Sequence, residues 1–405
     1  MQIELKISEK MDEIYRSWNG KNESRRIRVP LDLRDIMDIK SYTFLTLKTR
    51  YGETVSFEVW PAYKEDAVRD SMSAYVTREV FDLIKIEGEK TIESEVINPE
   101  ESITIGCDPE LFLVDKNTGK LLDASRYFKK WQTFGSDGML LELRPIHSNS
   151  EETLTKNLFN LIVRGRDEIN KNRLILEPKN VGLIGASFYG GIAAGFHIHF
   201  GLPLELIFGK EKTAGVIQKI VKVLDYYLAI PTIIPEGEDD CARRSTPIIV
   251  YGKPGSYRVE PPPPTLEYRV PGGSMLRHPL LTRGMLGLGA VIVEDVVSRI
   301  RYHTDDFKNL NNMSKDSDIV ELYPNLPEMM EIMQTVCSTN TRKAMYHLDK
   351  IVDDVGQMLT FKNRSESITN FFKMLYNGTK FSNDIEKNWR DYYNEQNEQG
   401  SLESY

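Results

Sequence analysis

The segment Gly195-Phe196-His197-Ile198-His199-Phe200-Gly201 is the stretch from which the fold can be inferred. Successive side chains of a β-strand point to opposite faces of a sheet, so His197 and His199 share one face and the apolar residues around them occupy the other. Such a strand is typical of a sheet that has one face in a hydrophobic core and the other face in a polar site.

Other strand-like segments place charged residues at the same two-residue spacing. They are Asp108-Pro109-Glu110, Glu142-Leu143-Arg144 and Glu267-Tyr268-Arg269. An apolar run follows Glu110 and another surrounds Glu142, and burying these carboxylates is costly unless a cation pairs with them. Asp108-Pro109 taken alone is equally consistent with a turn. We favour buried, paired carboxylates for Glu142, with Arg144 on the same face.

A segment rich in arginine and glycine lies between the histidine strand and the last of these strands. It contains Cys241-Ala242-Arg243-Arg244 and Tyr251-Gly252-Lys253-Pro254-Gly255-Ser256-Tyr257-Arg258. Arginine offers fixed, bidentate donors to phosphate and carboxylate groups, and glycine lets a backbone approach a ligand closely. A solvated charged surface is the alternative, but the charges alternate with aromatic and glycine residues, which favours a binding loop.

Composition restricts the class of protein. The chain has 405 residues, a net charge of -8, 40% hydrophobic and 28% charged residues, and three cysteines. The acidic balance disfavours broad binding of nucleic acid. Three cysteines cannot form a disulfide framework, and the first residues resemble no signal peptide, so we expect a cytoplasmic protein. No apolar run is long enough for a transmembrane helix, so we expect no membrane partner.

The pattern along the chain divides it into three regions. Residues 1–98 alternate in short runs and predict a small, mostly β accessory domain that ends in an acidic linker at 86–95. Residues 101–300 interleave strands with helices at about 151–162, 211–228 and 280–300, and a proline run at 261–264 predicts an extended connector. Residues 301–405 read as helices. We therefore predict an α+β fold, a curved, mostly antiparallel sheet with helices on one face.

The free face of that sheet would collect four carboxylates beside imidazoles and arginines. Asp108, Glu110, Glu142 and Glu267 would repel one another and raise each other's pKa values unless divalent cations bind between them. Oxygen-rich ligation with an occasional histidine suits Mg²⁺, or Mn²⁺ in its place, better than a thiolate-type Zn²⁺ site. Metal ions held beside arginines are what phosphoryl transfer requires.

The order of these motifs resembles the carboxylate-amine ligase superfamily, which includes glutamine synthetase and glutamate-cysteine ligase. Within it, the chain is most similar to the bacteriophage amidoligases of type 2, and the resemblance covers residues 101–300. It implies a glutamine synthetase-like catalytic domain that binds ATP over a curved sheet, with two or three Mg²⁺ ions held by acidic residues and one histidine. The family's Glu-x-Glu is replaced here by Asp108-Pro109-Glu110, which leaves the role of Asp108 open.

The resemblance implies a role for each candidate residue. The implied metal ligands are Asp108, Glu110, Glu142, His197 and Glu267. The implied contacts of phosphate or of the acyl phosphate are Arg144, Arg244, Arg258 and Arg269, and the implied nucleotide-binding residues are His199, Arg243, Tyr251 and Lys253.

The resemblance also implies an activity. A substrate carboxylate would attack the γ-phosphate of ATP, and an amine would displace phosphate from the resulting acyl phosphate, giving an amide or isopeptide bond. The substrates would be small molecules, peptides or protein side chains that offer a carboxylate and an amine. Assembly into a homo-oligomer or a virion stays open, because no interface can be read from the sequence.

Two alternatives belong to other classes. His197, His199 and Glu267 could form a facial triad for a redox metal in an oxygenase or hydrolase, which would leave the arginines unexplained. The chain could also be a phage structural protein that keeps the ligase fold without turnover. Iron without ATP affinity would favour the first alternative. The absence of phosphate release across a broad panel of substrates would favour the second.

Overall fold

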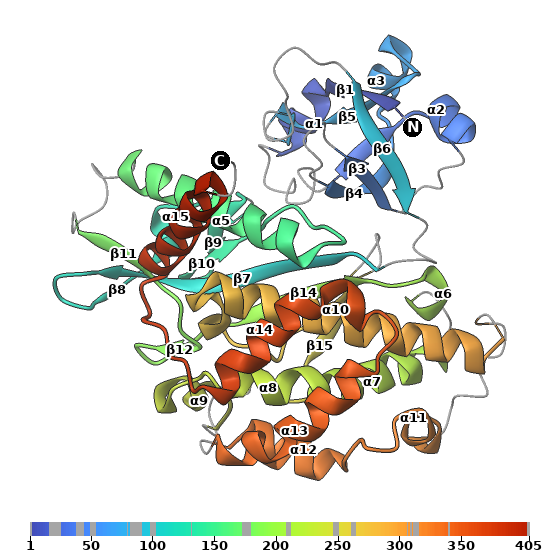
Figure 1. Ribbon diagram of the computed structural model, residues 1–405. Helices are drawn as coiled ribbons and strands as arrows, with labels where there is room; N and C mark the ends of the chain where they lie inside the picture. The colour runs from blue at the N-terminus through green and yellow to red at the C-terminus, as the bar shows by residue number, and fades with distance from the viewer. Residues whose placement is uncertain are drawn as a thin grey trace.

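Two β-rich parts follow each other along the chain in the computed structural model, and helices complete it (Figure 1). The structure describes residues 2–15, 26–37, 44–48, 54–78, 80–81, 91–97, 103–130, 132–171, 180–207, 212–245, 251–260, 265–305, 307, 310, 316–338 and 341–402. The predicted proline connector at 261–264 lies outside these residues.

The N-terminal part is a closed β-barrel in which short apolar strands share one small core. Its strands, in the order of pairing, are β1 (Gln2–Ile7), β5 (Ser73–Val76), β2 (Arg26–Val29), β4 (Thr54–Pro61), β3 (Phe44–Lys48) and β6 (Thr91–Ile97). Three short helices accompany the strands: α1 (Glu9–Tyr15), α2 (Leu31–Met37) and α3 (Lys64–Arg69). Closure of the barrel leaves no unpaired sheet edge. The prediction of a small, mostly β unit is confirmed.

The predicted acidic linker is wrong from Thr91 onward. Strand β6 begins there and pairs with both β1 and β3, so this half of the run belongs to the barrel. The acidic residues hid a strand pattern, because Ile92 and Val96 keep the two-residue spacing while glutamates stand between them. Residues 86–90 of the run lie outside the described part of the chain.

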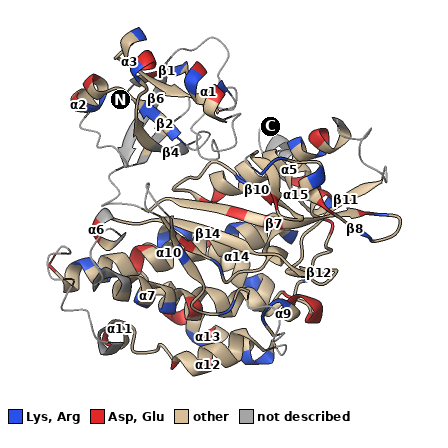
Figure 2. Cartoon of the chain, turned by 180° about the vertical axis from the view of Figure 1, so that it is seen from behind, with Lys and Arg blue, Asp and Glu red and all other residues tan. Residues whose placement is uncertain are grey.

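The second part contains an eight-stranded sheet whose strand pairs are all antiparallel. The main path is β15 (Tyr257–Glu260), β16 (Thr265–Tyr268), β14 (Phe196–Gly201), β7 (Ile105–Asp115), β10 (Leu140–Leu143) and β9 (Phe134–Asp137). Strands β8 (Leu121–Leu122) and β11 (Val181–Ile184) pair with the far end of β7. A small hairpin, β12 (Phe188–Tyr189) and β13 (Ile192–Ala193), follows. The long strand β7 joins both halves, and Figure 2 shows acidic positions within it.

The two faces of this sheet differ as the alternation predicts. On one face, Cys107, Leu111 and Ile198 are buried in the main hydrophobic core. Helices α5 (Glu151–Lys171), α7 (Lys212–Leu224) and α10 (Pro279–His303) contribute their apolar residues to the same core. The predicted helix at 211–228 is interrupted, because its last turn is a π-helix, Asp225–Ala229. The opposite face carries the charged residues.

The remaining helices extend the core away from the sheet. They are α6 (Leu204–Ile207), α8 (Ile230–Ile233), α9 (Glu238–Ser245), α11 (Asp316–Leu322), α12 (Met329–Val336), α13 (Arg342–Gly356), α14 (Ser365–Tyr376) and α15 (Ile385–Leu402). The buried Trp389 of α15 donates its indole N–H to the carbonyl of Leu276 at 2.7 Å. Arg166 of α5 is paired with Glu386 of α15. The last helix is therefore fixed to the part that carries the sheet.

The fold class predicted from the sequence is confirmed: an antiparallel sheet with helices, a β unit before it and helices after it. The domain limits at residues 98, 101 and 300 stay a prediction.

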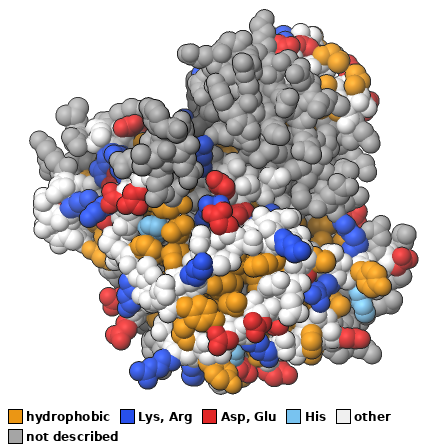
Figure 3. Space-filling view, in the orientation of Figure 1, with side chains coloured by type: hydrophobic (Ala, Val, Ile, Leu, Met, Phe, Trp, Pro, Cys, Tyr) orange, Lys and Arg blue, Asp and Glu red, His pale blue; other side chains and the backbone are white. Residues whose placement is uncertain are grey.

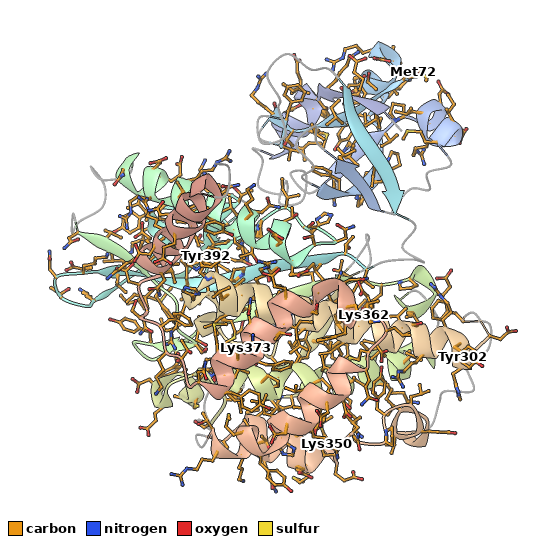
Figure 4. All side chains as sticks on the ribbon, in the orientation of Figure 1. Met72, Tyr302, Lys350, Lys362, Lys373 and Tyr392 are labelled. Atoms are coloured by element: carbon orange, nitrogen blue, oxygen red, sulfur yellow. The ribbon has the colours of Figure 1, made fainter. Side chains whose placement is uncertain are left out.

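Among the described residues, no helix is both long and apolar enough to cross a lipid bilayer. Acidic and basic side chains are interspersed over the face in Figure 3. Figure 4 places Met72 on the barrel and the exposed Tyr302 near the end of α10.

The packing of α10 against α14 generates a prediction about two glycines. A Cβ atom at Gly284 would lie 2.3 Å from the Cβ of Phe371, whereas a Cβ at Gly215 in α7 would have no atom within 4 Å. We expect Gly284→Ala to lower the free energy of unfolding by roughly 1–3 kcal/mol through overpacking. The same substitution at Gly215 should raise it by about 0.4–1 kcal/mol. Urea unfolding of both variants measures this, and equal signs would contradict the packing described.

Candidate active site

The strand register places the charged residues in a diagonal row across the free face of the sheet. Glu142 on β10 lies directly opposite Glu110 on β7. Two residues before Glu110 on β7, Asp108 lies opposite His197 on β14. Two residues further along β14, His199 lies opposite Glu267 on β16. Directly opposed residues point to the same face of a sheet. The register therefore gathers residues that are more than 150 positions apart in the sequence.

Three of these residues meet in one cluster. Nδ1 of His197 lies 3.3 Å from Oδ1 of Asp108 and 3.4 Å from Oε1 of Glu267. One donor atom from each residue falls within 4.8 Å of the other two, which makes the group able to hold a metal ion. Oδ1 of Asp108 and Oε2 of Glu267 are buried and receive no well-aligned hydrogen bond from the described residues. We name this group the Asp108–His197–Glu267 cluster.

The charges in the cluster act on one another. Burial works to raise the pKa of Asp108, but the neighbouring imidazoles of His199 and His197 outweigh it and hold that pKa well below its usual range. Burial raises the pKa of Glu267, and the nearby Asp108 adds to the rise although the imidazoles and Arg269 oppose it. Two carboxylates this close are stabilised by positive charge between them, which a divalent cation would supply.

Two arginines border the cluster. Arg269 donates to Oε1 of Glu267 at 2.7 Å, and its side chain is 14% exposed. Arg258, directly opposite Glu267 on β15, lies 3.9 Å from Oε2 of Glu267 and is 61% exposed. The half-buried guanidinium of Arg269 is fixed by its carboxylate, whereas the exposed guanidinium of Arg258 can reach an anionic ligand above the sheet. The structure thus brings Arg258 and Arg269 beside the cluster, as the sequence predicted.

Glu110 lies near the cluster but contacts other groups. Its Oε2 accepts the backbone N–H of Gly195 at 2.6 Å and lies 3.1 Å from the phenol oxygen of Tyr251. That phenol oxygen lies 2.6 Å from Nε2 of His197. Burial, followed by the charge of Glu110, raises the pKa of Tyr251, so the phenol keeps its proton. Tyr251, predicted to bind nucleotide, therefore bridges two predicted metal ligands.

Glu142 and Arg144 form a buried ion pair at the edge of the free face. Arg144 also donates to the carbonyl of Gln132 at 3.0 Å. A Cβ at Gly135 would lie 2.8 Å from Nη1 of Arg144, so β9 passes close to this guanidinium at a position where a side chain would not fit. Glu142 and Glu110 are opposed like charges; Arg144 neutralises Glu142, whereas Glu110 accepts hydrogen bonds from the Gly195 backbone and from Tyr251. The structure does not bring Glu142 or Arg144 into the Asp108–His197–Glu267 cluster.

Arg243 and Arg244 are fully buried in α9 and lie away from the cluster. Arg244 pairs with Glu236 and donates to the carbonyl of Val336. Arg243 donates to the carbonyls of Val270 and Arg269 and stacks over the ring of Tyr251. Burial, followed by the charge of Arg244, lowers the pKa of Arg243 to about 10. Both guanidinium groups are occupied by protein acceptors, so we do not propose them as phosphate contacts.

Two further predicted residues are placed differently from each other. Nε2 of His199 lies 3.2 Å from Oδ1 of Asp108, so this imidazole borders the cluster. Lys253 lies in the loop between Tyr251 and Ser256. Burial raises the pKa of Cys337, at the end of α12, and the charges of Arg244 and Lys253 oppose that rise. The structure brings His199 to the cluster, and nucleotide binding by Lys253 stays a prediction.

Sequence reasoning missed the buried polar residues that support the free face. Glu236 accepts from Ser187, and Asp240 accepts from the backbone of Ser187 and from Arg277. These bonds join α9 to the residue before the small hairpin and to the 3-10 helix Gly273–Arg277. Asp225 in the π-helix accepts from Tyr268 and from the backbone of Gly255. The signal was the acidic run directly before Arg243 and Arg244, which predicts internal ion pairs.

One family model matches most of the chain that carries this site. The family model described as "Phage phiEco32-like COOH.NH2 ligase-type 2" matches residues 105–390. No curated protein matches the chain. Similar solved structures include a bifunctional glutathione synthetase from Pasteurella multocida, with 10% identity and a TM-score of 0.31 over 69% of this chain and 56% of that chain. The chain thus spans little more than half the length of that synthetase.

Two more solved structures are similar at a comparable level. One is a "novel glutamine synthase homolog", with 13% identity, a TM-score of 0.33, and coverage of 63% of this chain and 70% of that chain. The other is the complex between the prokaryotic ubiquitin-like protein Pup and its ligase PafA, with 12% identity, a TM-score of 0.39, and coverage of 75% and 71%. These likenesses are too distant to carry an activity over.

Asp225 generates a prediction about pH. Burial raises its pKa from 3.8 to about 7, although Tyr268 and Gly255 oppose the rise. Between those pH values the folded protein binds more protons than the unfolded chain, so this residue's contribution to stability falls as pH rises from 4 to 7. We expect Asp225→Asn, which cannot ionise, to flatten the decline in the free energy of unfolding over this window. Urea unfolding at several pH values measures it, and an unchanged slope would exclude Asp225 as the titrating group.

Proposed function

Because the chain belongs to the family of Phage phiEco32-like COOH.NH2 ligase-type 2 proteins, a family of carboxylate-amine ligases, we propose that it forms an amide or isopeptide bond at the expense of ATP. The observation that carries the proposal is the Asp108–His197–Glu267 cluster with Arg269 and Arg258 at its border. Carboxylates that can hold a metal ion, with guanidinium groups beside them, are what the transfer of a phosphoryl group requires.

The donor set suits a hard divalent cation. One imidazole and two carboxylates favour Mg²⁺ or Mn²⁺, and the facial triad of an iron oxygenase would need a second imidazole in the place of Asp108. The buried oxygens of Asp108 and Glu267 that lack well-aligned donors fit such an ion. We propose Asp108, His197 and Glu267 as the ligands. A divalent cation bound there would neutralise charge on the triphosphate during transfer.

The arginines would act on the transferred group. We propose that Arg258, which is largely exposed, binds the terminal phosphate of ATP. Arg269, held in place by Glu267, would contact the same phosphate from the neighbouring position. A carboxylate oxygen of the substrate attacks the γ-phosphorus, and the bond to the bridging oxygen of ADP breaks. An amine nitrogen then attacks the carbonyl carbon of the acyl phosphate, and phosphate leaves together with the proton that the amine loses. Bidentate guanidinium groups suit both the triphosphate and the acyl phosphate.

The N-terminal barrel could bind the substrate. Ile146, which follows β10 and the Glu142–Arg144 pair, is buried in the same hydrophobic cluster as the barrel residues Val29 and Leu33. The barrel is thus attached directly beside the edge of the charged face. We propose an amino acid, a peptide or a protein side chain as substrate, with the barrel binding the larger ones.

The test is turnover with ATP, Mg²⁺ and a panel of amino acids and peptides. We expect phosphate release that depends on a carboxylate substrate, and a hydroxamate when hydroxylamine replaces the amine, because hydroxylamine traps an acyl phosphate. Asp108→Asn and Arg258→Met should each lower the rate by about 100-fold or more. Asp353→Asn, on the exposed side of α13, is the matched control and should leave the rate unchanged.

Two results would contradict the proposal. ADP formation without hydroxamate would exclude an acyl phosphate, even if the protein is an ATPase. No phosphate above background with any member of the panel would favour a structural protein that has kept the ligase fold.

A further inference from the structure

Tyr251 connects Glu110 to His197 through short contacts on the free face. Its phenol oxygen lies 2.6 Å from Nε2 of His197 and 3.1 and 3.3 Å from the carboxylate oxygens of Glu110. On the other side of the imidazole, Nδ1 faces Asp108 and Glu267 at 3.3 and 3.4 Å. The two ring nitrogens of His197 therefore face two different environments, one on the phenol side and one on the cluster side.

Two glycines and one arginine make room for the contact between Tyr251 and His197 and hold the phenol ring in place. A Cβ at Gly195 would lie 2.6 Å from Nε2 of His197 and 3.0 Å from the phenol oxygen of Tyr251. Gly252 has φ +71° and a Cβ there would lie 2.1 Å from Arg243, so a side chain is excluded at both positions. Arg243 donates to the carbonyls of Val270 and Arg269, and its guanidinium lies against one face of the Tyr251 ring, 4.6 Å from the ring centre. The phenol has little freedom to move.

The direction of the hydrogen bonds follows from the acceptors. The carboxylate of Glu110 can only accept, and it already receives the N–H of Gly195. A phenol O–H donated to this carboxylate is charge-assisted, which makes it the stronger of the two choices open to Tyr251. The phenol oxygen then accepts the N–H from Nε2 of His197. A neutral imidazole carries one proton, so Nδ1 is left as a lone pair.

The contacts of Nδ1 of His197 with the cluster agree with a proton on Nε2 and a lone pair on Nδ1. Oδ1 of Asp108 receives no well-aligned hydrogen bond from the described residues, although Nδ1 of His197 is only 3.3 Å away. A proton on Nδ1 would be expected to point at one of the two carboxylates. Nδ1 of His197, Oδ1 of Asp108 and Oε1 of Glu267 face one another, and a cation held between them would add to the stabilisation that Arg269 gives to Oε1 of Glu267.

We propose that Tyr251 and Glu110 are positioning residues that fix the Nε2–H tautomer of His197, so that its Nδ1 is presented to a divalent cation. The inference rests on the proposed function, since it concerns the same cluster. It gives Glu110 a role through Tyr251, in place of the direct ligation that the sequence suggested. Groups that orient a metal-binding histidine commonly change metal affinity by about 10- to 100-fold.

The first experiment measures Mn²⁺ affinity by electron paramagnetic resonance of the free ion, without ATP. We expect Tyr251→Phe to weaken binding about 10- to 100-fold. Tyr257→Phe, a neighbouring tyrosine on β15, is the matched control and should bind as the native protein does. Equal affinity of Tyr251→Phe and native protein would overturn the proposal.

A double-mutant cycle then separates the two roles of Glu110. If Glu110 acts through the phenol, Glu110→Gln should add little to the loss already caused by Tyr251→Phe, because both break the same connection. If Glu110 binds the ion directly, the two losses in affinity should multiply, and the role proposed for Glu110 would be wrong.

Nuclear magnetic resonance of the metal-free protein reads the tautomer itself. The chain has six histidines, so ¹⁵N-labelled histidine gives a small number of signals, and His197→Asn assigns the one of interest. We expect the Nε2–H form in the native protein and a shift toward the Nδ1–H form in Tyr251→Phe. A native Nδ1–H form would overturn the proposal.

The outcomes also separate this inference from the proposed function. Native protein that binds no Mn²⁺, or binds it equally well after Asp108→Asn, would remove the metal site and with it both proposals. Binding that is lost in Asp108→Asn and unchanged in Tyr251→Phe would leave the ligase proposal standing and end the inference about the tautomer.

Discussion

The antiparallel pairing of β7, β14 and β16 is the constraint on which the site depends. It sets Asp108 opposite His197 and His199 opposite Glu267, and a shift by one residue would turn every one of these side chains into the hydrophobic core. The core residues on the reverse face, such as Ile198, hold the register because they are fully buried. The same apolar alternation that stabilises the sheet therefore also assembles the charged cluster.

The alternation allowed the main features to be predicted from sequence. The spacing of His197 and His199, the apolar residues between them and the similar spacing in three other segments predicted one polar face and an antiparallel sheet. The short alternating runs of residues 1–98 predicted a mostly β unit in the same way, and two of these runs form β3 and β4. The alternation of apolar and polar residues is a local property of the chain, so it can be recognised in the sequence without knowledge of the tertiary structure.

Partners in space could not be predicted in the same way. Arg243 and Arg244 looked like phosphate ligands because a sequence does not distinguish an exposed guanidinium from one buried against Glu236 or a carbonyl. Glu142 was correctly read as buried and paired, but its partner Arg144 removes it from the cluster. The acidic run that ends in β6 was misread because its glutamates alternate with apolar residues, a pattern that a strand accommodates as readily as a linker does.

The Asp108–His197–Glu267 cluster lowers the stability of the metal-free protein, and the same arrangement would favour binding of a divalent cation. Burial raises the pKa of Glu267 even though Arg269 donates to it, so keeping this carboxylate ionised beside Asp108 lowers stability unless a further cation binds. Tyr251, which contacts both Glu110 and His197 and lies against Arg243, helps to hold the residues in place despite that cost.

The most direct test of this account is anomalous diffraction from crystals grown with Mn²⁺. We predict a manganese peak coordinated by Asp108, Nδ1 of His197 and Glu267, with Glu110 outside its coordination sphere. A peak bound between Glu110 and Glu142, with the cluster unoccupied, would contradict the central claim.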